Sequence, residues 1–357
     1  MSSRIDLALE LHQQSSRLEE AGDWAGAEHL CRQALAIFEE EDGPDSPDVA
    51  NLSCDLAAIL ESRGDYSGAE QCARRAIAIV EPVLAAFEGS DGALILLRAL
   101  SLLGTALRQQ GFYPQALAPL ERAIELAEAL PENPANAAEA WNNLGIVCKY
   151  AGWFERGAAA YRTALRWAER CAEGTCLQAT IWHNIGGLEH ARERFDSAEE
   201  PARRAWEIRR TALGDEHPAA LADAVAYAAV LDGLGRLDES RPIYERALAA
   251  YEARFGPRHF EVAATLHNLA VLERAEGNLA RAAELARRAR ETKRTLLGEE
   301  HPDTALTTLV LASILWELGR TGEARALARQ AAEVFTGRLA PGHPHLAQAR
   351  ELLGRMG

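Results

Sequence analysis

The chain is 357 residues long and acidic, with 53 Asp and Glu residues against 38 Lys and Arg residues and a formal net charge of -15. This balance excludes the usual electrostatic route to nucleic acid, since proteins that bind a phosphate backbone use Lys and Arg to displace counterions. Hydrophobic residues make up 48% of the chain but aromatic residues only 6%, which favours helices packed through alanine and leucine over a β-sandwich core. The sequence holds no apolar run of signal-peptide or membrane-span length, so we expect a cytoplasmic protein without a membrane partner.

The six cysteines are scattered along the chain. In a chain of this size, such scatter indicates reduced thiols rather than a disulfide framework. Cys171 and Cys176 form the only close pair, and no second Cys or His pair lies nearby to complete a tetrahedral zinc site. We therefore expect neither a metal nor another cofactor.

An alanine-anchored pattern recurs eight times. In most copies a glycine is followed two residues later by an aromatic residue or leucine, then three residues later by a small residue, and seven residues after that by alanine. The spacings of the anchoring alanines are, by subtraction, 42, 47, 41, 41, 42, 42 and 42 residues. This period is typical of helical solenoids, in which each hairpin buries its apolar face only by stacking on its neighbours. The anchoring alanines are Ala34, Ala76, Ala123, Ala164, Ala205, Ala247, Ala289 and Ala331.

The period predicts one all-α array over residues 1–357, built from helix-turn-helix repeats and closed by a C-terminal capping helix. A repeat array has no single core that must grow with length, so the usual division of a long chain into globular domains does not apply. The repeats are expected at approximately residues 8–49, 50–96, 97–137, 138–178, 179–220, 221–262, 263–304 and 305–346, and the cap at 347–357.

Glycine ends the first helix of seven repeats, from Gly22 in the first to Gly319 in the last, because glycine tolerates the left-handed conformation that closes a helix. Repeat four shows the unit most clearly, with a first helix predicted over 138–151 and a second beginning near Glu155. Repeat five carries Glu193 in the glycine position, so we expect its turn to be strained or reshaped.

Two tryptophans occupy the same position on the first helices of repeats four and five. They are Trp141 and Trp182, and they lie on or beside the apolar stripe of each helix. We expect both to be largely buried between hairpins.

Two segments, AWNNLGIVCKYAGWFERGAAAYRTAL and TLHNLAVLERAEGNLARAAELARRA, resemble tetratricopeptide repeats. Four linkers sharpen the resemblance, because LGDEHPAALA from Leu213, FGPRHFEVA from Phe255, LGEEHPDTA from Leu297 and LAPGHPHLA from Leu339 recur every 42 residues. This Gly-x-x-His-Pro type of linker resembles that of the kinesin light chain type of tetratricopeptide repeat. The resemblance implies a right-handed superhelical solenoid in which the first helix of each hairpin lines a concave groove.

The linker histidines are His217, His259, His301 and His343. Packed helices lie roughly 8 to 10 Å apart, whereas ligand nitrogens lie about 2.1 Å from a zinc ion, so histidines on successive hairpins cannot share an ion. We expect each histidine, with the proline that usually follows it, to shape the turn and start the next helix.

The groove-lining face of the first helices is the expected binding surface. Asparagine recurs nine residues before the turn position in three repeats, at Asn143, Asn184 and Asn268. A carboxamide offers donors and an acceptor, so a row of them can bond the backbone of an extended peptide. Peptide-binding tetratricopeptide grooves, by resemblance, use asparagine at this position. The alternative is that these side chains cap, hydrate or bond neighbouring first helices without any ligand.

Basic and polar residues extend this face. They make the middle of the groove neutral to basic within an acidic protein, which suits an acidic peptide or one with a free C-terminal carboxylate. The further expected peptide-binding residues are Arg98, Arg108, Asn142, Lys149, His183, His190, His267 and Arg274.

No catalytic signature stands out. The sequence has no phosphate-binding loop ending in Gly-Lys-Ser/Thr, no His-Glu-x-x-His, no Gly-x-Ser-x-Gly and no Cys-x-x-Cys. We therefore predict a non-catalytic scaffold that holds a protein or peptide segment in the groove. A ligand-responsive regulatory sensor with the same superhelix is the first alternative, and an enzyme with an active site built in the groove is the second.

Overall fold

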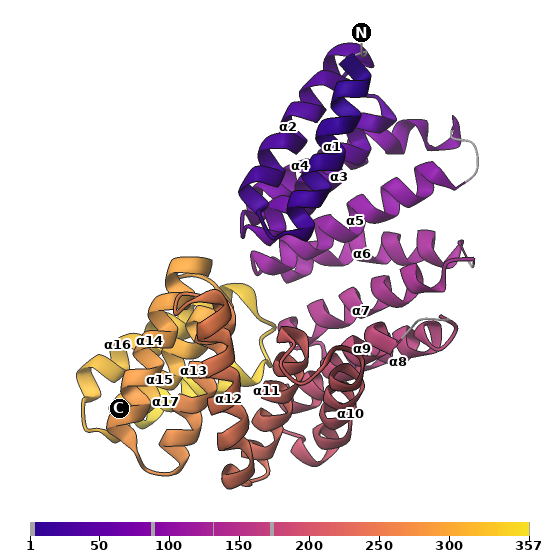
Figure 1. Ribbon diagram of the computed structural model, residues 1–357. Helices are drawn as coiled ribbons and strands as arrows, with labels where there is room; N and C mark the ends of the chain where they lie inside the picture. The colour runs from indigo at the N-terminus through magenta and orange to yellow at the C-terminus, as the bar shows by residue number, and fades with distance from the viewer. Residues whose placement is uncertain (1–3, 87–89, 131, 172–174, 357) are drawn as a thin grey trace. The chain divides into compact units, whose positions relative to one another are not determined.

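The computed structural model describes residues 4–86, 90–130, 132–171 and 175–356, and every regular element in these ranges is helical (Figure 1). The predicted hairpins are confirmed, because the helices follow one another in pairs from the first repeat to the eighth. The helices are α1 (Arg4–Glu20), α2 (Trp24–Glu41), α3 (Pro47–Ser62), α4 (Tyr66–Val80), the 3-10 helix η1 (Glu81–Ala86), α5 (Asp91–Gln109), α6 (Tyr113–Glu128), α7 (Pro134–Ala151), α8 (Phe154–Ala168), α9 (Thr175–Ala191), α10 (Phe195–Leu213), α11 (Pro218–Gly233), α12 (Leu237–Phe255), α13 (Phe260–Ala275), α14 (Leu279–Leu297), α15 (Pro302–Glu317), α16 (Thr321–Arg338) and α17 (Pro344–Arg355).

The chain divides into two compact units. Unit 1 comprises residues 1–144 and unit 2 residues 145–357, so the division falls inside α7. Unit 1 holds the hairpins α1–α2, α3–α4 and α5–α6 with the start of α7. Unit 2 holds the rest of α7, the helices α8 to α16, and α17.

Each hairpin closes through backbone geometry that the sequence pattern predicts. At Gly64 the backbone φ is +80°, and the next N–H, on Asp65, reaches back to the carbonyl oxygen of Leu60 at 2.8 Å. The Asp65 carboxylate then accepts the N–H of Gly68 at 2.9 Å and caps α4. Glu193 takes the same left-handed conformation with φ +58°, as the strained turn in repeat five requires, and among the described residues no other side chain-bearing residue has a positive φ.

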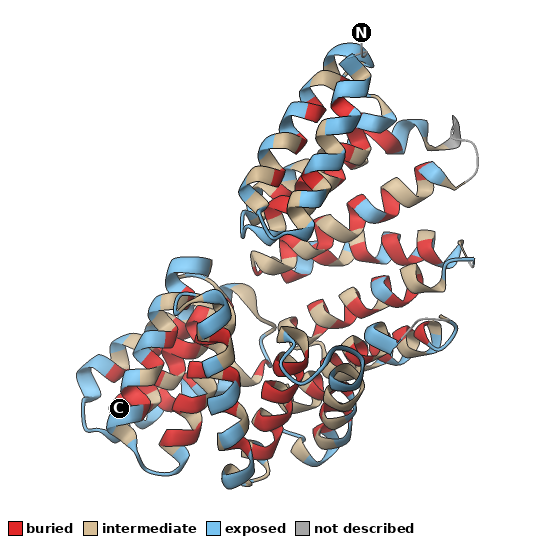
Figure 2. Ribbon diagram, in the orientation of Figure 1, coloured by how far each residue is buried: buried red, intermediate tan, exposed pale blue. Residues whose placement is uncertain are grey.

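The anchoring alanines are all fully buried, at 0% exposure. Figure 2 shows that buried residues recur along the helices of both units. Small residues also mark the closest helix approaches. A methyl group at Gly145 of α7 would collide with the ring of Tyr161 on α8. Small residues therefore let the helices approach closely, while buried tyrosines and leucines such as Tyr161 and Leu120 fill the space between them.

The prediction that Trp141 and Trp182 are largely buried is wrong, because both side chains are only partly buried. The indole N–H of Trp141 donates to the Glu128 carboxylate at 2.9 Å, and the Arg204 guanidinium lies 5.0 Å from the centre of the Trp182 ring. An indole at the edge of the contact between helices is more favourable than a fully buried one, because its apolar rings pack while its N–H or its π face binds a polar partner.

The capping helix is confirmed as α17, which buries Leu346, Ala349 and Leu352. These side chains join the apolar cluster of the last hairpin, which includes Leu315 of α15 and Phe335 of α16. α17 thus covers an apolar face that no ninth hairpin covers within the described residues.

Candidate functional site

Polar side chains on the first helices pair with polar side chains of the next first helix. In unit 1, the Asp55 carboxylate of α3 lies 2.9 Å from His12 Nε2 of α1 and 2.6 Å from an Arg98 Nη atom of α5. Burial alone would raise the pKa of Asp55, but the His12 hydrogen bond and the Arg98 charge outweigh it and hold that pKa below its usual value. Arg98, an expected ligand-binding residue, is therefore already paired in the structure.

A cavity of about 500 Å³ lies beside this ion pair in unit 1. Arg98 of α5 and Asn143 of α7 both line it, so the structure brings together two of the expected binding residues. Leucines, hydroxyl groups and further polar residues complete the wall. These are Leu94, Leu97, Ser101, Leu102 and Thr105 of α5, and Asn133, Asn136 and Glu139 at the start of α7 and just before it.

The cavity residues that sequence analysis missed follow a simple spacing. Ser101 and Thr105 lie three and seven residues after Arg98 on the same face of α5. Asn136 lies seven residues before Asn143 and so shares its face of α7. Following the same helix face in both directions from Arg98 and Asn143 would have identified these residues from the sequence. Burial raises the pKa of the Glu139 carboxyl at the same wall.

In unit 2 the expected residue His183 also pairs across repeats. Its Nδ1 lies 2.8 Å from the carboxylate of Asp223 on α11, whose side chain is only 3% exposed. Arg209 of α10 donates to the other Asp223 oxygen at 2.6 Å and to the Thr180 hydroxyl at 2.9 Å. This triad holds α9, α10 and α11 together, and His183 has a structural partner.

Other expected residues of unit 2 show the same behaviour. His267 lies 3.1 Å from the Thr307 hydroxyl of α15, and burial, helped by the charge of Lys293, lowers the pKa of His267 to about 3. Arg274 of α13 donates to the Glu317 carboxylate of α15 at 2.9 Å.

The remaining expected residues differ in exposure. Asn142 and Asn184 are buried, at 5% and 7% exposure, whereas Asn143 and Asn268 are half-buried. Burial lowers the pKa of His190, and its ring meets the edge of Phe195 with centroids 5.4 Å apart. The other two are Arg108, which donates to Gln109 at 3.3 Å, and Lys149, which lies 4.6 Å from the Tyr150 ring centre. Asn143 belongs to unit 1, and Asn184 and Asn268 belong to unit 2.

A second cavity, of about 790 Å³, lies beside the turn between α13 and α14 in unit 2. The Glu273 carboxylate in its wall is only 2% exposed and accepts from Arg241 at 3.0 Å and Asn278 at 2.8 Å. Burial would raise the pKa of Glu273, but these hydrogen bonds hold it below its usual value. Its hydrogen-bonding capacity is thus used in joining α12 to the α13–α14 turn.

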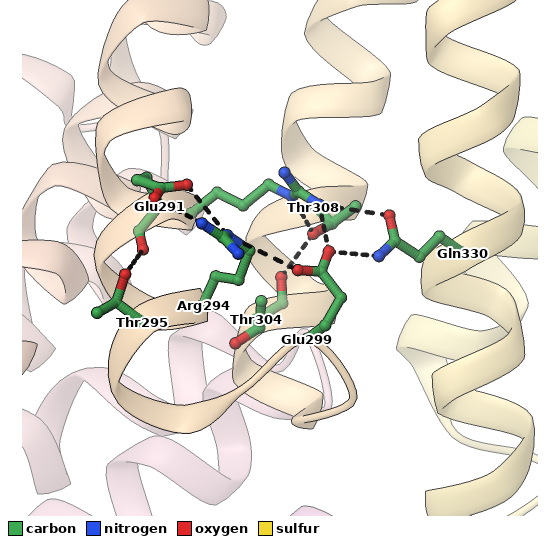
Figure 3. Close-up of polar contacts among 8 residues, drawn as sticks. Glu291, Arg294, Thr295, Glu299, Thr304, Thr308 and Gln330 are labelled. Atoms are coloured by element: carbon green, nitrogen blue, oxygen red, sulfur yellow. Dashed lines mark hydrogen bonds and ion pairs between the residues drawn. The ribbon is translucent and has the colours of Figure 1, made fainter.

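The linker between α14 and α15 carries a third polar cluster (Figure 3). Arg290 of α14 donates to the Thr308 hydroxyl at 2.9 Å and also bonds Glu299. Gln330 of α16 bonds Glu299 from the other side. A cavity of about 420 Å³ adjoins Glu299 and Gln330. These contacts join the linker residue Glu299 to α14 and α16 and join α14 to α15 through Thr308, so their role is structural.

Two further findings concern metal binding and membrane insertion. Within the described ranges, no three His, Cys, Asp or Glu side chains gather closely enough to hold a metal ion. Every helix in the same ranges is too short or too polar to span a lipid bilayer.

A family model described as Tetratricopeptide repeat matches the chain at six places, of which the last five overlap in succession. The matched residues are 16–81, 95–170, 136–211, 177–253, 221–295 and 261–337. No curated protein matches the chain in sequence.

Solved structures with the same fold include the apo form of the quorum sensor NprR from B. thuringiensis, with a TM-score of 0.66 and 12% identity over 94% of this chain and 89% of that one. The Rap conjugation gene regulator of plasmid pLS20, solved with the Phr* peptide, has a TM-score of 0.62 and 14% identity over 82% of this chain and 74% of that one. The kinesin light chain repeats of Podospora anserina are 23% identical over 49% of this chain and 83% of that one, with a TM-score of 0.39.

Proposed function

Because this chain belongs to the tetratricopeptide repeat family, we propose that it is a non-catalytic scaffold that binds a peptide or protein segment against its first helices. The observation that carries this proposal is the cavity between α5 and α7, whose wall includes Arg98 and Asn143. Its volume of about 500 Å³ lies within the range of pockets that hold small ligands or a few amino-acid residues.

The wall of this cavity suits an extended polypeptide. Leu94, Leu97 and Leu102 offer apolar contact for a ligand side chain. Asn136 and Asn143 offer carboxamides seven residues apart on one helix, which is about 10.5 Å at 1.5 Å per residue. Peptide groups repeat at roughly 3.3 Å per residue in an extended chain, so the two carboxamides can bond groups about three residues apart.

Charge at the cavity favours one carboxylate rather than many. Arg98 is 43% exposed at its side chain and bonds Asp55 through one Nη atom. A ligand carboxylate can therefore share the guanidinium, which has five donors. Glu139 faces the same cavity and disfavours a second negative group. We propose that the ligand is a peptide that places a single carboxylate, such as a free C-terminus, at Arg98.

Unit 2 carries a proposed binding surface of its own. Asn268 is half-buried on α13 and Lys149 is half-buried on α7, and we propose that both contact the partner. For the expected residues His183, His267 and Arg274, which already bond neighbouring repeats, we propose a role in supporting this surface.

A peptide library tests the scaffold proposal. Random peptides are selected on the wild-type chain, and the enriched peptides are titrated by fluorescence anisotropy against wild type and a double variant with Asn136→Ala and Asn143→Ala. We expect a loss of about 0.5–1.5 kcal/mol per lost hydrogen bond. Gln33→Ala, at an exposed amide of the second helix α2, is the matched control and leaves affinity unchanged. Equal affinity for all three proteins would place the binding site elsewhere.

A regulatory sensor is the second candidate. It is favoured by the fold shared with the quorum sensor NprR and with the Rap regulator bound to the Phr* peptide. A sensor must bind ligand with different affinities in two conformations, whereas a scaffold need not change shape. Small-angle scattering with a selected peptide separates them, because only the sensor changes its radius of gyration.

A further inference from the structure

The segment that joins α16 to α17 contacts the opposite end of unit 2. The Ala340 N–H donates to the Ala151 carbonyl at the end of α7, at 3.0 Å. Farther along, the Gln348 side-chain amide of α17 donates to the Glu193 carboxylate at 2.8 Å, across 155 residues of sequence. All four residues belong to unit 2, so its last elements meet its first turns.

The turn between α7 and α8 is shaped for this contact. A methyl group at Gly152 would lie 2.9 Å from Cδ2 of His343, because the His343 ring packs directly on the glycine. The equivalent turn glycines Gly64, Gly235 and Gly277 have no atom within 4 Å at that position. The His343 ring also faces Phe154, with centroids 5.9 Å apart.

The linker histidines His343 and His217 differ in their exposure. His343 is 4% exposed, whereas the equivalent His217 is exposed. Both cap the following helix in the same way, with Nδ1 accepting an N–H two residues later at 3.1 Å and 3.2 Å. The difference therefore arises from the turn that covers His343 and not from capping.

Glu193 supplies a separate observation. It holds φ +58° at the position where the other seven repeats have glycine. A side chain in this conformation is less favourable than glycine, because its Cβ atom crowds the backbone carbonyl oxygen. Its carboxylate is also the group that Gln348 bonds, so the same residue carries both the backbone cost and the contact with α17.

We propose that residues 340–348 form a strap that closes unit 2 on itself, and that Glu193 is present in place of glycine to hold it. The strap is distinct from the capping role of α17, which uses the apolar side chains Leu346, Ala349 and Leu352. Closure brings His345 of α17 within electrostatic range of His190 on α9 and Asp303 on α15. A partner that reaches these inner residues must first open the strap.

Hydrogen exchange of the full-length chain, followed by mass spectrometry, tests the strap. Glu193→Gly removes the carboxylate and relieves the backbone, and Gln348→Ala removes the same hydrogen bond from the other side. Each variant is expected to raise the exchange rate of peptides covering 340–348 about fivefold, the equivalent of one hydrogen bond of about 1 kcal/mol. Glu193→Gln keeps an acceptor oxygen and restores a rate near wild type.

A control variant and two contrary results complete the test of the strap. Gln330→Ala removes an amide that bonds Glu299, so it alters exchange near the α14–α15 linker and leaves 340–348 unchanged. If Glu193 served only its own turn, Glu193→Gly would raise thermal stability without changing exchange at 340–348. Unchanged exchange at 340–348 in both Glu193→Gly and Gln348→Ala would overturn the proposal.

Discussion

The Nδ1 atom of His301 lies 3.1 Å from the backbone nitrogen of Asp303 and accepts its N–H, so the imidazole caps the start of α15. The linker histidines at α11, α13 and α17 make the same contact with the residue two positions later, at 3.1–3.2 Å. An acceptor Nδ1 carries no proton, and a positive ring is unfavourable at a helix N-terminus. At His343, where burial lowers the pKa to about 3, the cap therefore uses a neutral ring.

The first prediction concerns pH. Burial lowers the pKa of His343 from 6.5 to about 3. Between these two values the unfolded chain takes up a proton that the folded chain refuses, so stability falls as pH falls through 6.5 toward 3. From pH 7 to pH 5.5 this histidine costs about 1 kcal/mol. His343→Asn keeps a capping side chain without titrating, so urea unfolding of this variant should lose less stability over that interval.

His217→Asn is the control for the pH prediction. It changes the same capping position, but the His217 ring is exposed. The two variants are compared over the same pH interval, so the effect of burying His343 is read against the loss of a capping imidazole at an exposed position. A His343→Asn variant with the full wild-type pH dependence would contradict the argument.

The second prediction concerns the buried carboxylate of Asp223. Asp223→Ala leaves the mostly buried guanidinium of Arg209, 12% exposed, without its ion pair. Breaking such a pair costs about 3–5 kcal/mol because the remaining charge stays buried. Glu200→Ala removes an exposed pairing partner of Arg203 and Arg204 on α10 and should cost far less, because solvent screens exposed ion pairs. Chemical unfolding of both variants measures the difference, and similar losses would contradict it.

The third prediction concerns close helix packing. Gly145→Ala places a methyl group against the Tyr161 ring, and overpacking of this kind costs about 1–3 kcal/mol. Gly322→Ala on α16 meets no atom within 4 Å, so the helix preference of alanine should raise stability by up to about 1 kcal/mol. Thermal melts of the two variants should shift in opposite directions, and a shift of both in one direction would count against this packing.

The fourth prediction concerns Arg98 and rests on the proposed function. Asp55→Asn removes the negative partner of Arg98 and frees its guanidinium for a ligand carboxylate. A selected peptide should then prefer its free C-terminus over the C-terminal amide two- to fivefold more than on wild type at low salt, because exposed ion pairs contribute about 0.5–1 kcal/mol. Salt should reduce this preference. Arg98→Met should abolish it, and a preference that survives in Arg98→Met would assign the carboxylate to another residue.

Much of the fold follows from short-range sequence patterns. Glycine at the turn, an alanine twelve residues later and a histidine before the next first helix act within one hairpin or on its neighbour, so their spacing alone predicts the repeats and the cap. The left-handed turn at Glu193 follows from the same register. The sequence also indicates which helix faces carry Asn143, Asn184 and Asn268, because helical periodicity sets a face directly.

Only the tertiary structure decided which polar residues on those faces already have partners. Arg98 bonds Asp55, 43 residues away, and His183 bonds Asp223, 40 residues away, and each bond depends on the rotation between successive hairpins. The meeting of Gln348 with Glu193 depends on that rotation summed over several repeats. A repeat period specifies that hairpins stack, but not the angle by which each one turns, because side-chain packing at every interface sets that angle.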